Sequence, residues 1–201
     1  MSDNKEAGRI ILADLKMFNE AVILFEQEID PAFWLEFNKA IECWAKDRRW
    51  NIGGDMELEN KYSWLAPEVY EEKLRFDFKS DVKQENGWLS YSLANLCGVG
   101  TAIGGLLFSY EVEGKGWKRA ARSIRDDYTD RLKPLGFSTS NSDENPFYLP
   151  LQLDASGLVD AWINDDFDEL LCPLVTALGN LEKAVPILNE FVEEVRALSQ
   201  V

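Results

Sequence analysis

The sequence contains no histidine. Histidine is the general base of the Ser-His-Asp and Cys-His catalytic groups and a common zinc ligand, so the chain cannot build these sites from its own residues. An enzyme of this sequence would have to work with carboxylates, Lys, Tyr, Ser or a bound cation. This absence, together with the lack of a strong catalytic motif, favours a binding function over an enzymatic one.

Cysteines and long apolar runs are also scarce. The three cysteines, Cys43, Cys97 and Cys172, are far apart and form no CxxC pair. We therefore expect buried free thiols in a reducing compartment. No run of 18 apolar residues is present, and the first seven residues lack the basic start and apolar stretch of a signal peptide. The sequence thus predicts a cytoplasmic protein without a membrane segment.

Basic residues are outnumbered, with 21 Lys and Arg against 36 Asp and Glu and a net charge of −15. This field disfavours nucleic acid and anionic lipid as partners and favours a basic protein. Residues 138–201 carry 12 acidic and 2 basic residues, whereas residues 115–133 carry 7 basic and 3 acidic ones. We expect these two segments to pair with each other, inside the fold or across a homodimer.

Apolar residues make up 46% of the chain, which is enough for one compact domain spanning residues 1–201. They recur at helical spacing at both ends of the chain, which predicts helices over about 8–49 and 155–199. We expect a break in the first region at Asp30-Pro31. Pro and Gly residues interrupt the C-terminal pattern, so we expect two or three packed helices there, or one kinked helix.

The central region, residues 60–112, alternates apolar and polar residues with a period of two, which is typical of half-buried strands. A basic helix over 115–134 follows, and residues 51–55 are expected to form a loop. The expected strands are 62–65, 74–79, 89–93, 106–112 and 147–153. This order predicts an α+β fold, with a mainly antiparallel sheet of about four to five strands and the N-terminal and C-terminal helices packed on it.

One strand carries a candidate catalytic motif, Leu74-Arg75-Phe76-Asp77-Phe78-Lys79. An apolar strand with Asp-x-Lys and an upstream carboxylate resembles the core motif of the PD-(D/E)XK nuclease superfamily. The resemblance implies Mg²⁺ or Mn²⁺ held by Asp55 and Asp77, with Lys79 positioning or activating the attacking water. Glu57 and Glu59 are substitutes for Asp55. The alternative is an amphipathic strand that shows its charged residues to solvent.

A glycine-rich segment, residues 97–105, loosely resembles a dinucleotide-binding loop. Such a loop must open a helix, so that the helix N-terminus meets the phosphates. Here the following residues alternate like a strand. The sequence therefore predicts a connection or bulges between strands.

Carboxylates cluster in Asn164-Asp165-Asp166-Phe167-Asp168-Glu169. Ca²⁺ binding is disfavoured because the run has no turn glycine and no regular ligand spacing. The run can cap a helix, or it can serve as a docking surface for a basic partner. The expected partner-binding residues are Asp165, Asp166, Asp168, Glu169, Glu193 and Glu194.

The leading hypothesis is an acidic interaction module, without a cofactor, that binds, neutralises or escorts a basic or nucleic-acid-handling protein. Immunity proteins, antitoxin-like inhibitors, DNA mimics and chaperones are the types that fit. The second hypothesis is a metal-dependent nuclease, or an inactive relative of one. The third is a self-assembling homodimeric structural protein.

Overall fold

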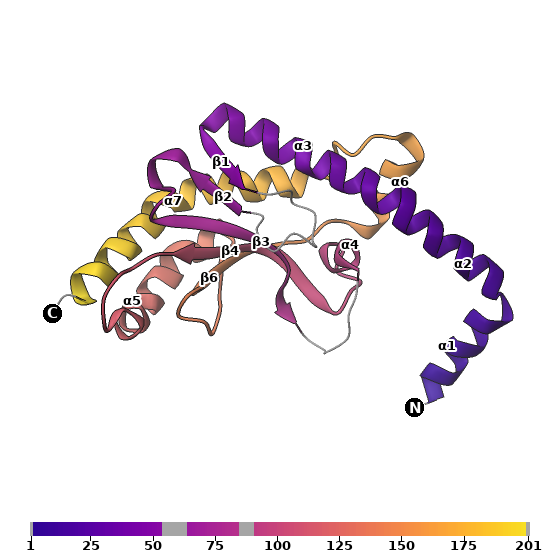
Figure 1. Ribbon diagram of the computed structural model, residues 1–201, viewed down its shortest axis with the longest axis horizontal. Helices are drawn as coiled ribbons and strands as arrows, with labels where there is room; N and C mark the ends of the chain where they lie inside the picture. Colours follow the sequence, from indigo (N-terminus) through magenta and orange to yellow (C-terminus); the bar gives the residue numbers. More distant parts are fainter. Residues whose placement is uncertain (1, 54–63, 85–90, 200–201) are drawn as a thin grey trace. The chain divides into compact units, whose positions relative to one another are not determined.

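The computed structural model describes residues 2–53, 64–84 and 91–199 (Figure 1). Side chains are described for residues 5–53, 64–79 and 91–199. The chain divides into two compact units, Met1–Glu36 and Phe37–Val201, each with its own internal contacts. Every helix among the described residues is too short or too polar to cross a membrane.

The N-terminal unit is helical and contains a break at Asp14. Helix α1 covers Ser2–Ala13, α2 covers Leu15–Leu24, a π-helical turn η1 covers Phe25–Ile29, and α3 begins at Asp30 and runs to Arg48. Asp14 has φ −134° and ψ 57°, and its carboxylate accepts a hydrogen bond from the Met17 backbone N–H at 3.2 Å. This cap ends α1 and starts α2.

A new α-helix, α3, begins at Asp30 as predicted, but the expected break in the helical backbone is absent. Asp30 has helical angles, φ −62° and ψ −47°, and its backbone N–H donates to the Phe25 carbonyl. Pro31 is the second residue of α3, in its first turn, where a missing N–H is best tolerated. The backbone therefore stays helical through this point.

The second unit contains a six-stranded sheet in the order β1-β2-β3-β4-β6-β5, with every pair antiparallel. The strands are β1 Trp50–Gly53, β2 Trp64–Pro67, β3 Leu74–Gln84, β4 Ala102–Tyr110, β5 Ser138–Thr139 and β6 Phe147–Leu151. A 3₁₀ turn, η2 (Glu68–Tyr70), links β2 to β3. The predicted α+β class is confirmed. The strand count exceeds the prediction because two short edge strands, β1 and β5, were not expected.

Strand β1 lies in the stretch that was predicted to be a loop. Trp50 pairs with Pro67 and Gly53 pairs with Trp64. Gly53 is required here because an added Cβ would lie 2.1 Å from the Trp64 indole Nε1. The Trp64 indole therefore lies against Gly53 of the edge strand β1. The sequence pattern predicted a loop at this glycine.

One face of the sheet carries the core. Paired positions such as Phe76 and Phe108, or Leu106 and Leu149, lie on the same face because opposite residues in a ladder share a side. Helices α5 (Trp117–Leu132) and α7 (Cys172–Ser199) lie side by side against this sheet (Figure 1). Phe191 of α7 is fully buried there.

The prediction of a strand over 89–93 is wrong for the described residues of that range, 91–93. Ser92–Leu96 forms the short helix α4. Leu93 and Leu96, three residues apart, are both buried, as one helix face requires. The Asn95 backbone N–H donates to the Tyr91 carbonyl at 3.1 Å. A short run of alternating leucines fits a strand and a helical turn equally well.

The C-terminal helices are confirmed as α6 (Ala155–Asn164) and the long α7. Helix α7 continues through Pro186, so one helix accounts for most of the predicted seam. Its inward side carries the apolar repeat. The buried residues are Leu174, Ala177, Leu178, Leu181, Ala184, Val185, Leu188, Phe191, Val192 and Val195.

The basic helix begins later than predicted, at Trp117. Gly114 and Gly116 have φ values of +109° and +90°, which end the preceding segment in a left-handed conformation. The helix α5 runs to Leu132 and a 3₁₀ turn, η3 (Lys133–Leu135), follows it.

All three cysteines are free thiols, as predicted. Only Cys97 is buried, and burial raises its pKa. Cys43 and Cys172 are exposed, so the expectation of buried thiols fails for these two.

Candidate functional site

Internal ion pairs use part of the acidic C-terminal third. Glu182 contacts Arg48 at 3.2 Å, and Glu190 contacts Arg131 at 2.6 Å. The Arg131 guanidinium lowers the pKa of the Glu190 carboxyl. The structure therefore shows pairing between the basic and acidic segments inside one chain.

Two of the six expected partner-binding residues, Glu193 and Glu194, lie in this internally paired part. Glu193 contacts Lys73 at 2.9 Å and Arg196 at 3.4 Å, and the Lys73 ammonium group lowers its pKa. Glu194 accepts a hydrogen bond from the Tyr128 hydroxyl at 2.7 Å. Both carboxylates have partners within the fold, so they offer little free charge to a second protein.

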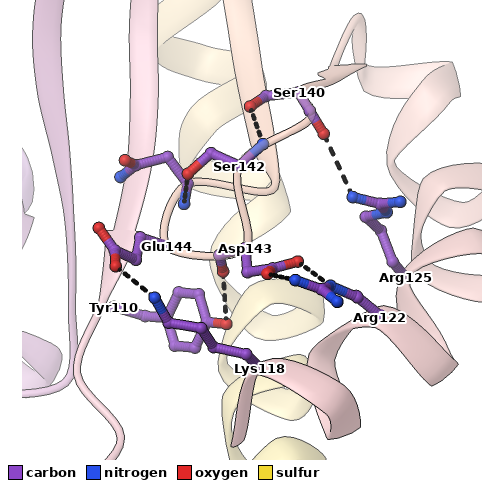
Figure 2. A network of polar contacts seen from close by, with 9 residues as sticks. Tyr110, Lys118, Arg122, Arg125, Ser140, Ser142, Asp143 and Glu144 are labelled. Atoms are coloured by element: carbon purple, nitrogen blue, oxygen red, sulfur yellow. Dashed lines mark hydrogen bonds and ion pairs between the residues drawn. The ribbon is translucent and has the colours of Figure 1, made fainter.

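Helix α5 uses two further cations to hold the loop that follows β5 (Figure 2). The Arg122 guanidinium donates to both carboxylate oxygens of Asp143, with Nε–Oδ1 at 2.7 Å. Lys118 contacts Glu144 at 2.8 Å. The hydrogen bond from Arg122 is the largest cause that lowers the pKa of Asp143. Paired charges of this geometry are charge-assisted hydrogen bonds.

The backbone of the same loop is also held. Arg125 donates to the Ser140 carbonyl at 3.3 Å, and the Tyr110 hydroxyl donates to the Asp143 carbonyl at 2.9 Å (Figure 2). Burial and the nearby Asp143 and Glu144 raise the pKa of Tyr110. The basic face of α5 therefore has a structural role and is largely used by this loop.

We expect Arg122→Ala to speed amide exchange of residues 140–145 several-fold, because the bidentate pair to Asp143 is lost and the loop opens locally. Arg119→Ala, an exposed control on the same helix, should leave exchange unchanged. Acidification of the wild type should likewise lower the protection of these amides, measured as their exchange rate relative to the intrinsic rate at each pH. The folded pKa of Asp143 is depressed, so its stabilisation is present above the unfolded value near 4 and is lost as pH falls below it. Unchanged exchange in Arg122→Ala would contradict this role.

Four of the remaining carboxylates line a pocket. Asp154, Asp160, Asp166 and Glu169 line a hollow of about 490 Å³ between α6 and the start of α7. This volume lies within the range of about 300–1,000 Å³ that is typical of ligand sites. We call this hollow the acidic pocket. No Lys or Arg lines it in the described part of the chain, and none of the four carboxylates forms an ion pair there.

Local structure fixes two sides of the acidic pocket. Asp154 is the N-cap of α6, and it accepts hydrogen bonds from the Ser156 hydroxyl at 2.6 Å and the Ser156 backbone N–H at 3.1 Å. The Ser156 hydroxyl is the largest cause that lowers the pKa of Asp154. Asp166 accepts from the Asp168 backbone N–H at 3.0 Å. These bonds hold two carboxylates in place.

Exposed apolar side chains flank the acidic pocket on α6. Val159 is 57% exposed and Ile163 is 71% exposed, and they lie on one face because they are four residues apart. Ile163 also lies one turn from Asp160. Asp165 adopts a left-handed conformation with φ +52° and ends α6, and Asp168 is exposed beyond it. The acidic pocket together with Val159, Ile163, Asp165 and Asp168 is called the docking surface.

The sequence predicts half of the acidic pocket. Asp166 and Glu169 belong to the predicted carboxylate run, whereas Asp154 and Asp160 were missed. Asp154 precedes Ser156 and a helix, which is an N-cap signal, but nothing local shows that the chain returns to it after α6.

The predicted nuclease residues are only partly described. Asp55 and its substitutes Glu57 and Glu59 lie outside the described residues. Asp77 and Lys79 share one face of β3, opposite the buried Phe76 and Phe78, as predicted. Asp77 accepts a hydrogen bond from the Ser109 hydroxyl on β4 and lies 3.9 Å from the Arg75 guanidinium.

The described residues around Asp77 form a hydrogen-bonded chain, and the carboxylates expected to share a cation with Asp77 lie outside the described residues. No group of three or more His, Cys, Asp or Glu in the described part of the chain is placed to hold a metal ion. The Asn145 amide donates to the Ser109 hydroxyl at 2.8 Å and to the Phe108 carbonyl at 3.1 Å. Asp77 thus belongs to a polar chain that ties β3 and β4 to the 140–145 loop.

The glycine-rich segment follows α4 and leads into β4, so it does not open a helix. The Asn95 side-chain oxygen accepts from the Ala102 backbone N–H at 3.1 Å, and an added Cβ at Gly100 would lie 2.1 Å from that oxygen. These contacts explain why a small residue is needed here without a nucleotide.

Comparisons of the chain with protein-family models, with curated proteins and with solved structures found no match.

Proposed function

We propose that this protein binds a basic protein through the docking surface. The observation that carries the proposal is the acidic pocket, whose four carboxylates lack a cation within the described chain, while other acidic residues of the same third are paired internally. A Lys or Arg side chain from a partner would supply the cation that the lining of the acidic pocket lacks, and it could donate charge-assisted hydrogen bonds to these carboxylates. The acidic pocket is large enough for such a side chain.

The apolar part of the docking surface supplies what charge alone does not. Electrostatic attraction steers and selects a partner, whereas affinity comes mostly from desolvated apolar contacts. Val159 and Ile163 offer such contacts beside Asp160. The partner that fits best has a Lys or Arg next to an apolar patch. Nucleic-acid-binding proteins are rich in basic surfaces, so they are a natural partner class.

The test compares two variants of equal net charge. Asp160→Asn, Asp166→Asn and Glu169→Gln together remove three charges from the acidic pocket, and Asp166→Asn keeps an oxygen for the Asp168 N–H. Asp126→Asn, Asp127→Asn and Asp130→Asn remove three charges from α5, away from the docking surface. Both triple variants carry a net charge of −12 instead of −15.

Each protein is immobilised at low salt and exposed to a lysate of the cells in which it occurs. We expect the wild type and the α5 variant to retain the same basic protein, and the pocket variant to retain at least about tenfold less of it. Equal capture by all three proteins, or no captured basic protein even at low salt, would overturn the proposal.

A further inference from the structure

The N-terminal unit exposes apolar side chains on an unusual scale. No residue of α2 or η1 is buried, and residues 5–13 of α1 are not buried either. Eight large hydrophobic side chains in α1 and α2 are each between 39% and 70% exposed. They are Ile10, Ile11, Leu12, Leu15, Met17, Phe18, Ile23 and Leu24. We call this set the N-terminal apolar face.

The size of this face matches a protein interface. These side chains are spread around both helices and together expose on the order of 700 Å², against the roughly 800 Å² that each partner contributes to a standard interface, so a partner that buries them must contact more than one side of the helices. Scattered single apolar residues are normal on a surface, but a set confined to two successive helices is typical of an interaction site.

The charges around the face bear on which kind of partner it fits. Residues 5–24 contain three cations, Lys5, Arg9 and Lys16, and three anions, Glu6, Asp14 and Glu20. This segment is therefore neutral in a chain whose net charge is −15. Arg9 and Glu6 pair at 2.7 Å, and Lys16 and Glu20 lie 3.6 Å apart. A strongly basic partner finds no net charge to recognise here, whereas a second copy meets no like-charge repulsion.

We propose that α1 and α2 pack against α1 and α2 of a second copy of this chain to form a homodimer. On α2, Lys16, Asn19, Glu20 and Ile23 occupy one side, while the residues on the rest of the circumference are Leu15, Met17, Phe18, Ala21, Val22 and Leu24. A helix that is apolar over more than half of its circumference can contact both helices of a partner. The dimer does not depend on the docking surface, so either proposal can fail alone.

Sedimentation equilibrium of the full chain from low to high micromolar concentration tests the dimer. We expect the wild type to have twice the chain mass of 22.9 kDa. Leu12→Glu with Met17→Glu should weaken association by at least about 100-fold, because two charges enter the apolar interface. Both positions are more than 60% exposed, so the helices themselves should still form.

The matched control is Val69→Glu with Leu198→Glu, which adds the same charge at exposed apolar positions outside the N-terminal unit. This variant should remain a dimer. A wild type that is monomeric at high concentration would overturn the inference, since the face would then be covered by the same chain or by a different protein. A dimer that survives Leu12→Glu with Met17→Glu would also overturn it, because the contact would lie elsewhere.

Discussion

Phe191→Ala is expected to lower the free energy of unfolding by about 3–5 kcal/mol. Phe191 is fully buried on α7, and its ring contacts four other aromatic rings. The centroid distances are 5.2 Å to Tyr128, 5.2 Å to Phe147, 5.5 Å to Tyr110 and 6.4 Å to Phe108. All four contacts are edge-to-face, which suits the charge distribution of aromatic rings.

The large loss of stability is expected because the four rings belong to different elements of the fold. They lie on β4, β6 and α5, so Phe191 joins the sheet to both long helices of the second unit. Truncation leaves a cavity that the strands cannot close without breaking their ladder. Urea unfolding followed by tryptophan fluorescence measures the change. Leu198→Ala is the control on the same helix, 46% exposed, and should cost less than about 1 kcal/mol. Equal losses in both variants would contradict this account of the core.

Gly105→Ala is expected to cost about 2–3 kcal/mol, although it adds a single methyl group. An added Cβ would lie 2.4 Å from the Leu149 carbonyl oxygen and 3.1 Å from the Pro150 Cα. Both atoms belong to the backbone of β6, which pairs directly with β4. A flexible side chain could move away, but here the two strands themselves must separate.

Gly179→Ala provides a control of opposite sign. Gly179 lies within α7, and an added Cβ at this position would have no neighbouring atom within 4 Å beyond the adjacent turns of its own helix. Replacing a helical glycine by alanine stabilises a helix by up to about 1 kcal/mol. The two variants should therefore shift the urea midpoint in opposite directions. A loss of stability in Gly179→Ala, or none in Gly105→Ala, would contradict the packing described here.

The parts of the fold that sequence could predict are those in which burial repeats along one element. Leu74, Phe76 and Phe78 alternate over β3, and α7 keeps its apolar repeat for most of its 28 residues. Such patterns follow directly from strand and helix geometry. The short elements could not be predicted in this way, because α4, β1 and β5 have too few residues for a period to appear. Their structure depends on contacts with distant segments, such as Trp64 over Gly53.

Only part of the candidate site could be predicted from the sequence, because its residues include both chain neighbours and residues that the fold brings together. The carboxylate run after α6 is visible in the sequence, because its members are neighbours in the chain. The internal partners of Glu193 and Glu194 are not visible, since Lys73 and Tyr128 lie 120 and 66 residues away. The sequence pattern therefore finds acidic residues, while only the fold separates carboxylates with an internal partner from those that line the acidic pocket.

The central claim is that the acidic pocket, and not net charge alone, binds the partner. The most direct measurement is the dissociation constant of the captured basic protein for the pocket variant and for the α5 variant. Both variants carry a net charge of −12, because each has three negative charges fewer than the wild type, whose net charge is −15. We expect the α5 variant to bind within about twofold of the wild type and the pocket variant to bind at least about tenfold more weakly. Equal weakening in the two variants would show that only overall charge matters and would contradict the claim.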